Sequence, residues 1–257
     1  MSFVAQKICK FPRKYNKVKE INEKGTARNL FRGFELFMFE RLKAGIVLKN
    51  TGLERRINMA KPTPQILNFY LIDNLTQWKK LGEGAAVWQF WGKVVMHLRN
   101  YMQPVAQKAS GTISSIEVWW VPEYWNPAPQ GIDIVVYLVP NPNYYSVIKK
   151  NGGDVSSVLS NDKILGVTDV NLKICEVYFD RCFQGSTKEV AGAAYHEAAH
   201  VKANQDNKMH AGKNGFLKES PDYNGDPTKE NTTFFSTHIA KTVNQKWVPF
   251  DKPKVTP

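Results

Sequence analysis

The sequence predicts a fold of the α+β class, in which helices and strands occur in separate runs along the chain. Three observations predict it: a helical apolar period before residue 110, β-branched and aromatic runs between 112 and 180, and a capped helix from 186. The composition is typical of a globular domain, because 42% of the 257 residues are hydrophobic and 12% are aromatic. A chain of this length can bury a core without disulfides or a structural metal.

The first 60 residues are predicted to form a basic, helical N-terminal extension, and the main domain is expected at 61–257. Residues 1–61 hold 15 Lys and Arg against 5 Asp and Glu, so +10 of the net charge of +12 lies there. The apolar residues of the segment 26–50 recur at helical spacing: Phe31, Phe34, Met38 and Leu42. Such a charge is typical of a solvated arm or of a region that contacts an acidic partner or surface.

No transmembrane segment is expected. The apolar runs between 118 and 148 are shorter than the roughly 18 residues of a membrane-spanning helix and are interrupted by prolines. The opening residues, "MSFVAQKICKFPRKYNK", contain no apolar core of signal-peptide length. The sequence therefore predicts a soluble protein without a Sec signal, either cytoplasmic or exported by a specialised leaderless route.

The three cysteines, Cys9, Cys175 and Cys182, lack the C-x-x-C spacing of a zinc site. Their odd number also argues against a disulfide framework. A bridge between Cys175 and Cys182 is left open.

Two helices are predicted before residue 110, followed by four strands. The helices are "QILNFYLIDNLTQWKKL" (65–81) and "EGAAVWQFWGKVVMHLRNYMQPVAQKA" (83–109), the second with an apolar stripe along one side. The strands are expected in runs bounded by Gly and Pro or rich in β-branched residues: "TISSIEVWWVPEY" (112–124), "GIDIVVYLVP" (131–140), "DKILGVTDV" (162–170) and "NLKICEVYFD" (171–180).

The segment "STKEVAGAAYHEAAHVKANQDNKMHAG" (186–212) carries the motif that points to a function. Ser186 and Glu189 have the spacing of a capping box, which predicts that a helix begins here. His196 and His200 are four residues apart on that helix, so both imidazoles point the same way and can bind one tetrahedral zinc ion.

Glu197 lies next to the first of these histidines and is expected to lean towards the same cleft. Zinc lowers the pKa of a bound water towards neutrality and polarises a scissile carbonyl. A carboxylate beside it can take the proton of that water and pass it to the leaving amine. We therefore expect Glu197 to act as the general base of a zinc hydrolase.

The His-Glu-x-x-His helix resembles the active-site helix of the zincin metallopeptidases. The resemblance implies a zincin-like metallopeptidase domain, which has a mixed sheet whose edge strand borders the cleft, with the active-site helix beneath it. It further implies that "NLKICEVYFD" is this edge strand and that an extended peptide substrate pairs with it by strand addition.

The third zinc ligand is not decided by the sequence. The metzincin branch resembles H-E-x-x-H-x-x-G-x-x-H, with Asp as the last ligand in one variant, and the corresponding positions here are Ala203 and Asp206. The resemblance therefore implies Asp206 as a ligand, although the glycine that turns the chain is missing. We expect Asn204 or Asn207 to supply a left-handed turn instead.

Two other residues compete for the same role. His210 is a better zinc ligand than a single carboxylate oxygen, and Glu219 has a spacing similar to that of the gluzincin branch. No methionine follows Met209, so the methionine turn of metzincins is absent. Tyr223, and His238 on an expected short C-terminal helix, are candidates for stabilising an oxyanion.

The motif favours a zinc-dependent endopeptidase that acts on a protein or peptide substrate with Zn²⁺ as its cofactor. A leaderless chain with a basic arm resembles a toxin or effector protease, or a virus-encoded one, more than a housekeeping exopeptidase. The alternative is a non-enzymatic particle or interaction module that retains a zincin fold. Stoichiometric zinc together with chelator-sensitive cleavage would distinguish the two.

Overall fold

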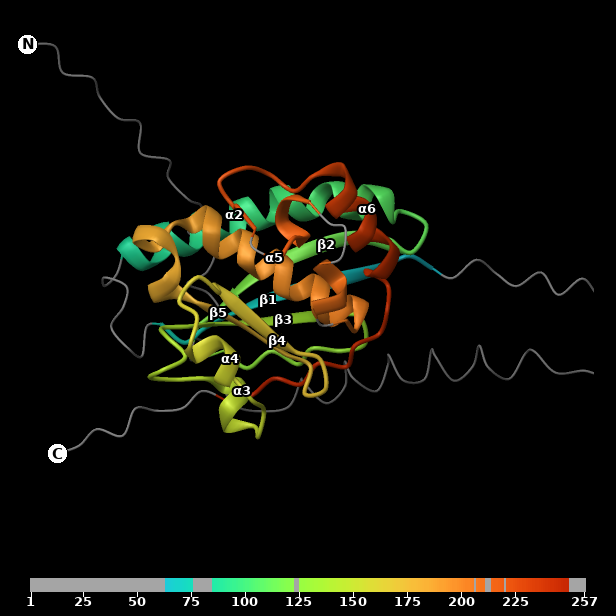
Figure 1. The fold of residues 1–257 in the computed structure, drawn as a ribbon. Coiled ribbons are helices and arrows are strands. Elements are labelled where there is room, and N and C mark those ends of the chain that lie inside the picture. Colours follow the sequence, from blue (N-terminus) through green and yellow to red (C-terminus); the bar gives the residue numbers. More distant parts are fainter. Residues whose placement is uncertain are drawn as a thin grey trace, which may run out of the picture. The chain divides into compact units, whose positions relative to one another are not determined.

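The computed structural model describes residues 63–75, 85–122, 125–205, 207–210, 214–219 and 221–249. The predicted N-terminal extension at 1–60, with its helix, lies outside the described residues, and so does Asp206. The described part combines helices with one five-stranded mixed sheet (Figure 1). Of the helices in this part, none has the length and apolar character needed to cross a bilayer.

The sheet has the strand order β2-β1-β3-β5-β4. Its strands are β1 (Gln65–Asp73), β2 (Ile113–Val121), β3 (Ile134–Val139), β4 (Gly166–Asp169) and β5 (Ile174–Tyr178). The neighbouring pairs are parallel except for β4, which runs antiparallel to β5. The sheet is therefore mixed, with its antiparallel strand at one edge.

The predicted helix at 65–81 is wrong, because residues 65–73 form the interior strand β1. Leu67, Phe69 and Leu71 face one hydrophobic core, while Tyr70 and Ile72 face the other. A strand buried on both faces reads as a continuous apolar run, which periodicity does not distinguish from a buried helix. As a result, helix and strand alternate as β1-α2-β2, and the expected separation into runs does not hold at the start of the domain.

The assignment of "NLKICEVYFD" as the edge strand is also wrong. Its strand, β5, lies between β3 and β4, and its five residues are all buried. The edge strand is β4, whose residues after Gly166 are only partly buried. The order of the strands along the chain does not predict which of them is the edge strand. β4 comes before β5 in the sequence, but β5 takes the position between β3 and β4 in the sheet.

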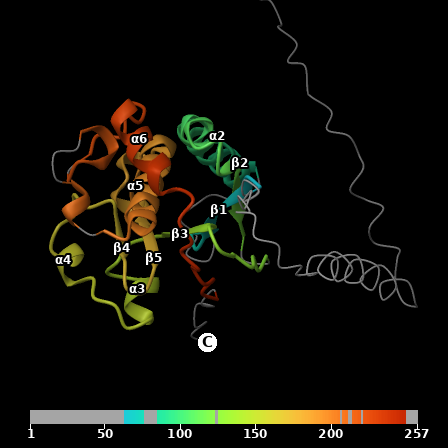
Figure 2. The same ribbon diagram turned by 90° about the vertical axis from the view of Figure 1, so that its right-hand side faces the viewer.

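The helices cover both faces of the sheet, as Figures 1 and 2 show. One face is covered by α2 (Ala85–Lys108), α5 (Thr187–Ala203) and α6 (Lys229–His238). The other is covered by the short helices α3 (Val147–Lys150) and α4 (Ser156–Leu159) and by part of the C-terminal segment. The helix expected at 83–109, the capped helix from 186 and the short helix around His238 are confirmed.

Gln245 links the C-terminal segment to the sheet by hydrogen bonds. Its side chain accepts a hydrogen bond from the Val135 amide at 2.8 Å and donates to the Val135 carbonyl at 3.1 Å and the Lys173 carbonyl at 2.8 Å. The buried amide therefore satisfies backbone groups of β3 and of the residue that precedes β5, as a neighbouring strand would.

Cys175 and Cys182 are both buried free thiols, so the bridge left open by the sequence is not present. Burial raises the pKa of each thiol, which keeps both protonated and unreactive.

Candidate metal centre

The helix that carries the His-Glu-x-x-His motif, α5, lies on the same face of the sheet as α2 and α6. The Ser186 side chain accepts a hydrogen bond from the Glu189 amide at 3.3 Å, which caps the helix as predicted. From Val190 onwards every residue of α5 is buried. Small residues allow this close packing, and at Gly192 any side chain would meet the ring of Tyr223.

Three histidines bring their Nε2 atoms together, and we call them the three-histidine cluster: His196, His200 and His210. The Nε2 atoms of His196 and His200 are 3.0 Å apart. The Nε2 atom of His210 lies 3.2 Å from that of His196 and 3.1 Å from that of His200. The three side chains therefore lie close enough to bind one metal ion.

Two backbone carbonyls fix the protonation of the first two imidazoles. His196 Nδ1 is hydrogen-bonded to the Phe216 carbonyl, and His200 Nδ1 lies 2.7 Å from the Gln205 carbonyl. A carbonyl oxygen can only accept, so each Nδ1 carries the hydrogen and each Nε2 of the neutral ring carries a lone pair. The lone pairs of His196 and His200 thus face one another at 3.0 Å, an arrangement that a cation stabilises.

The spacing of the three nitrogens suits a small divalent metal ion. Nitrogens 3.0–3.2 Å apart lie about 1.8 Å from the centre of their triangle. All three nitrogens can therefore reach one ion at the usual zinc–nitrogen bond length of about 2.0–2.1 Å. An ideal tetrahedral site at that bond length has nitrogens about 3.3–3.4 Å apart, so a small outward movement of the rings completes the geometry.

The turn after α5 supplies part of this arrangement. Asn204 ends the helix in the left-handed conformation, with φ 54° and ψ 47°, which confirms one of the two asparagines expected to replace the missing glycine. The Gln205 amide then donates to the His200 carbonyl at 3.2 Å. This is the hydrogen bond of a Schellman motif, and it places the Gln205 carbonyl against His200 Nδ1.

Two histidines of the cluster, His196 and His210, are held in the form that binds metals. Burial, followed by the charge of His200, lowers the pKa of His196 to about 3. Burial also lowers the pKa of His210, although the nearby Glu219 carboxylate opposes the change. Both side chains are therefore neutral at pH 7, and a neutral imidazole is the form that ligates a metal.

Glu197 lies against the edge strand β4. Its Oε2 accepts a hydrogen bond from the Thr168 hydroxyl at 2.8 Å, and only 4% of the residue is exposed. Burial raises the pKa of Glu197 to about 8, although the hydrogen bond from Thr168 lowers it in part. The carboxyl therefore titrates nearer to neutrality than an exposed glutamate does.

Three other described residues suggested by the sequence, Glu219, His238 and Tyr223, do not join the cluster. Glu219 is exposed, and it acts on His210 only through its charge. His238 lies on α6, where its Nδ1 is 2.8 Å from the Phe234 carbonyl of the same helix. Tyr223 is buried, with its ring centroid 6.4 Å from that of His196, so it packs against one histidine of the cluster.

Sequence reasoning missed the residues that hold the site in place. Gly166 and Thr168 contact the Glu197 side chain, and the carbonyls of Gln205 and Phe216 orient two imidazoles. Backbone carbonyls carry no residue signature, so no pattern in the sequence could have identified the last two. The glycine within the strand run "DKILGVTDV" was a usable signal, because glycine inside a strand often marks a close approach.

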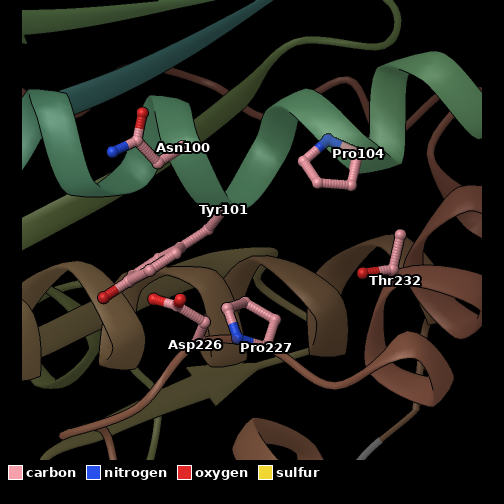
Figure 3. Close-up of a pocket in the computed structure, with 6 residues that line it drawn as sticks. All are labelled: Asn100, Tyr101, Pro104, Asp226, Pro227 and Thr232. Carbon is pink, nitrogen blue, oxygen red and sulfur yellow. The ribbon is translucent and has the colours of Figure 1, made fainter.

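A separate pocket of about 200 Å³ lies between α2 and the start of α6 (Figure 3). It is lined by Asn100, Tyr101, Pro104, Asp226, Pro227 and Thr232, and by no histidine of the cluster. The Tyr101 ring packs edge-on against Phe216 with centroids 5.2 Å apart, and the Phe216 carbonyl accepts from His196. The pocket is therefore distinct from the three-histidine cluster, and Tyr101 and Phe216 connect the two by direct contacts.

Comparison of the sequence with protein-family models and with curated proteins finds no match.

Proposed function

We propose that the chain is a zinc-dependent endopeptidase with a zincin-like domain. One observation carries the proposal: three imidazole Nε2 atoms lie 3.0–3.2 Å from one another on and beside a His-Glu-x-x-His helix. In this proposal, His210 is the third protein ligand, because it completes the cluster. Asp206, the alternative with the metzincin spacing, lies outside the described residues.

The donor set fits zinc. Three neutral imidazoles leave one position of a tetrahedral ion open, as catalytic zinc sites require. Two of the ligands donate their second ring nitrogen to backbone carbonyls, which is the usual support of metal-binding histidines. Zinc bound there would lower the pKa of a coordinated water towards neutrality and polarise a peptide carbonyl.

Glu197 acts as the general base in this proposal. A higher pKa makes the ionised carboxylate a stronger base, and burial raises the pKa of Glu197 to about 8. Positive charge at the three-histidine cluster would favour its ionised form, because an opposite charge lowers the pKa of a carboxyl. The side chain follows His196 directly on α5, so the base and the ligands are held by one rigid element.

The edge strand β4 is the surface proposed for the substrate. β4 has one neighbour in the sheet, β5, and its Gly166 and Thr168 contact the Glu197 side chain. An extended peptide that pairs with the free edge of β4 would lie beside the base and would satisfy its own backbone groups. This placement replaces the one expected from the sequence, in which β5 was the edge.

The arrangement of the sheet supports a zincin-like domain. The resemblance implies a mixed sheet whose edge strand borders the cleft next to the active-site helix, and β4 beside α5 corresponds to that description. The expectation of a toxin, effector or virus-encoded protease rests in part on the basic segment at 1–60, which lies outside the described residues.

The proposal is tested by measuring zinc and hydrolysis in one preparation. The full chain is purified without added metal, its zinc content is determined by elemental analysis, and cleavage of unfolded casein is followed with and without a chelator. We expect one zinc ion per chain and cleavage that the chelator abolishes. Zinc without cleavage of casein or of a mixed peptide library would favour the interaction module, and absence of zinc would refute the proposed metal centre.

A further inference from the structure

We infer that strand β4 positions the Glu197 carboxyl through the hydroxyl of Thr168 and the absent side chain of Gly166, which makes both of them positioning residues for hydrolysis. The inference rests on the proposed function and deepens it. In the proposed function β4 binds the substrate. Here β4 has a second role, because it also holds Glu197, the proposed base.

The first contact is a hydrogen bond. Thr168 Oγ1 lies 2.8 Å from Glu197 Oε2 and 3.0 Å from the Glu197 backbone carbonyl oxygen. A hydroxyl has one hydrogen to donate, and an ionised carboxylate is the stronger acceptor of the two. Thr168 therefore restrains the carboxylate when Glu197 is ionised, which is the form that a general base requires.

The second contact is the close approach of Gly166 to the Glu197 side chain, which leaves no room for a Cβ atom at position 166. A Cβ atom at position 166 would lie 2.9 Å from both Cγ and Oε1 of Glu197, and 2.7 Å from the backbone oxygen of Glu176. Real Cβ atoms do not approach other atoms so closely, and the Glu176 backbone is fixed in β5. The backbone at Gly166 does not have a positive φ, so glycine is needed here for the room it leaves and not for its conformation.

The pleat of β4 explains why both contacts come from one strand. Gly166 and Thr168 are two residues apart, so they share the face of the sheet that meets α5. Val167, between them, packs against the core of the other face. A four-residue strand thus presents two successive inward positions to the same carboxyl, while no strand in the described part of the chain pairs with its outer edge.

The hydrogen bond is tested with Thr168→Val, which keeps the shape of the side chain and removes the hydroxyl. We expect kcat on casein to fall about tenfold, the effect of losing one hydrogen bond to a charged group, with KM within twofold of the wild type. Zinc content should stay at one per chain, and Thr168→Ser should restore most of kcat. Thr233→Val, which removes an exposed hydroxyl bonded to its own helix, is the matched control and should change nothing.

The space requirement is tested with Gly166→Ala, for which Gly225→Ala is the control because nothing lies within 4 Å of a Cβ there. We expect Gly166→Ala to lower kcat at least tenfold, and Gly225→Ala to leave it unchanged. If Gly166→Ala does not fold, the Thr168 series still decides the outcome. Wild-type kcat in Thr168→Val, or failure of Thr168→Ser to restore activity, would overturn the inference.

A double-mutant cycle separates this inference from the proposed function. Melting temperatures of Thr168→Val, Glu197→Ala and the double variant are measured without substrate, together with their zinc content. We expect Thr168→Val to lower the melting temperature clearly less once Glu197 is truncated, because the hydroxyl then has only the backbone carbonyl of residue 197 as its acceptor. If the chain hydrolyses nothing, the proposed function fails even where this coupling is found. If it hydrolyses casein but the coupling is absent, the inference alone fails.

Discussion

Two buried glutamates, Glu176 on β5 and Glu197 on α5, differ in how their carboxyl groups are satisfied. Glu176 accepts hydrogen bonds from the Ser146 hydroxyl at 2.9 Å and from the Ile148 amide, and its pKa is raised to about 7 by burial. Glu197 accepts from the Thr168 hydroxyl, and burial raises its pKa to about 8. Both residues are almost inaccessible to solvent, at 0% and 4% exposure.

The difference indicates two roles for the same side chain. Ser146 is also the N-cap of α3, where it accepts from the Lys149 amide at 3.0 Å, so the Glu176 carboxyl belongs to a network that holds a loop and a short helix. Glu197 is held by a single side-chain hydroxyl and follows a metal-ligand candidate on its own helix. Glu176 therefore belongs to a structural network, whereas proton transfer is the role proposed above for Glu197.

The largest effect is expected from removing His210, which should change the site near Glu197 and leave the surroundings of Glu176 intact. His210→Ala should lose most of the zinc and all measurable hydrolysis, because two protein ligands do not close a tetrahedral site. The network around Glu176 should be unaffected, so the protein should remain folded by circular dichroism. Asp206→Ala is the comparison variant and should keep its zinc. The reverse result, in which only Asp206→Ala loses its zinc, would show that Asp206 is the third ligand.

Glu197→Gln should lower hydrolysis of casein by at least about a hundredfold, the usual scale for losing a general base. Glutamine has the size of glutamate and accepts the Thr168 hydrogen bond, but its amide does not act as a base near neutral pH. Zinc content and melting temperature should stay at their wild-type values. Glu176→Gln is the matched control for a buried carboxyl, and its hydrolysis rate should be that of the wild type. Full activity in Glu197→Gln would mean that another group is the base.

Glu176→Gln should instead change how stability depends on pH. The folded-state pKa of about 7 lies above the ordinary value of 4.5, so this carboxyl stabilises the fold fully below pH 4.5 and loses that contribution as pH rises through 7. The difference in free energy of unfolding between wild type and variant should therefore shift by up to about 3 kcal/mol between pH 4 and 8. Urea titrations at several pH values measure it, and Glu230→Gln on the exposed face of α6 controls for the loss of one charge. A difference that does not vary with pH would contradict the structural role of the buried Glu176 carboxyl.

The smallest effect is expected from removing residues 1–60. The contacts described for both glutamates and for the three-histidine cluster lie within residues 63–249, so the remainder should fold and bind zinc as the full chain does. Thermal melting and elemental analysis of the truncated chain check this. Aggregation, or loss of a cooperative transition, would show that the Phe-rich segment at 26–50 belongs to the core.

The parts of the fold that the sequence predicted are those with a local signal. The cap at Ser186, the spacing of His196 and His200, and the left-handed turn at an asparagine each depend on neighbours in the chain, and the structure confirms the cap and the turn at Asn204. β1 was misread as a helix because both of its faces are buried, so its apolar residues show no alternation. The edge position of β4 depends on the order of strands in the sheet, which local sequence does not encode.

The same distinction applies to the site. The sequence left Asp206, His210 and Glu219 open as the third ligand, because the path of the chain after Asn204 determines which side chain returns to the helix. Thr168 and Gly166 lie 29 and 31 residues before Glu197, and only the pairing of β4 with β5 brings them to α5. Long-range contacts of this kind were beyond pattern reasoning on a single sequence.

X-ray absorption spectroscopy at the zinc edge, on the full chain purified without added metal, tests the three-histidine metal centre most directly. The account predicts one zinc ion per chain with nitrogen or oxygen neighbours at about 2.0–2.1 Å, and outer-shell scattering from three imidazole rings that falls to two in residual zinc-bound His210→Ala. A spectrum with sulfur neighbours, with fewer than three imidazoles in the wild type, or a preparation without stoichiometric zinc would contradict it.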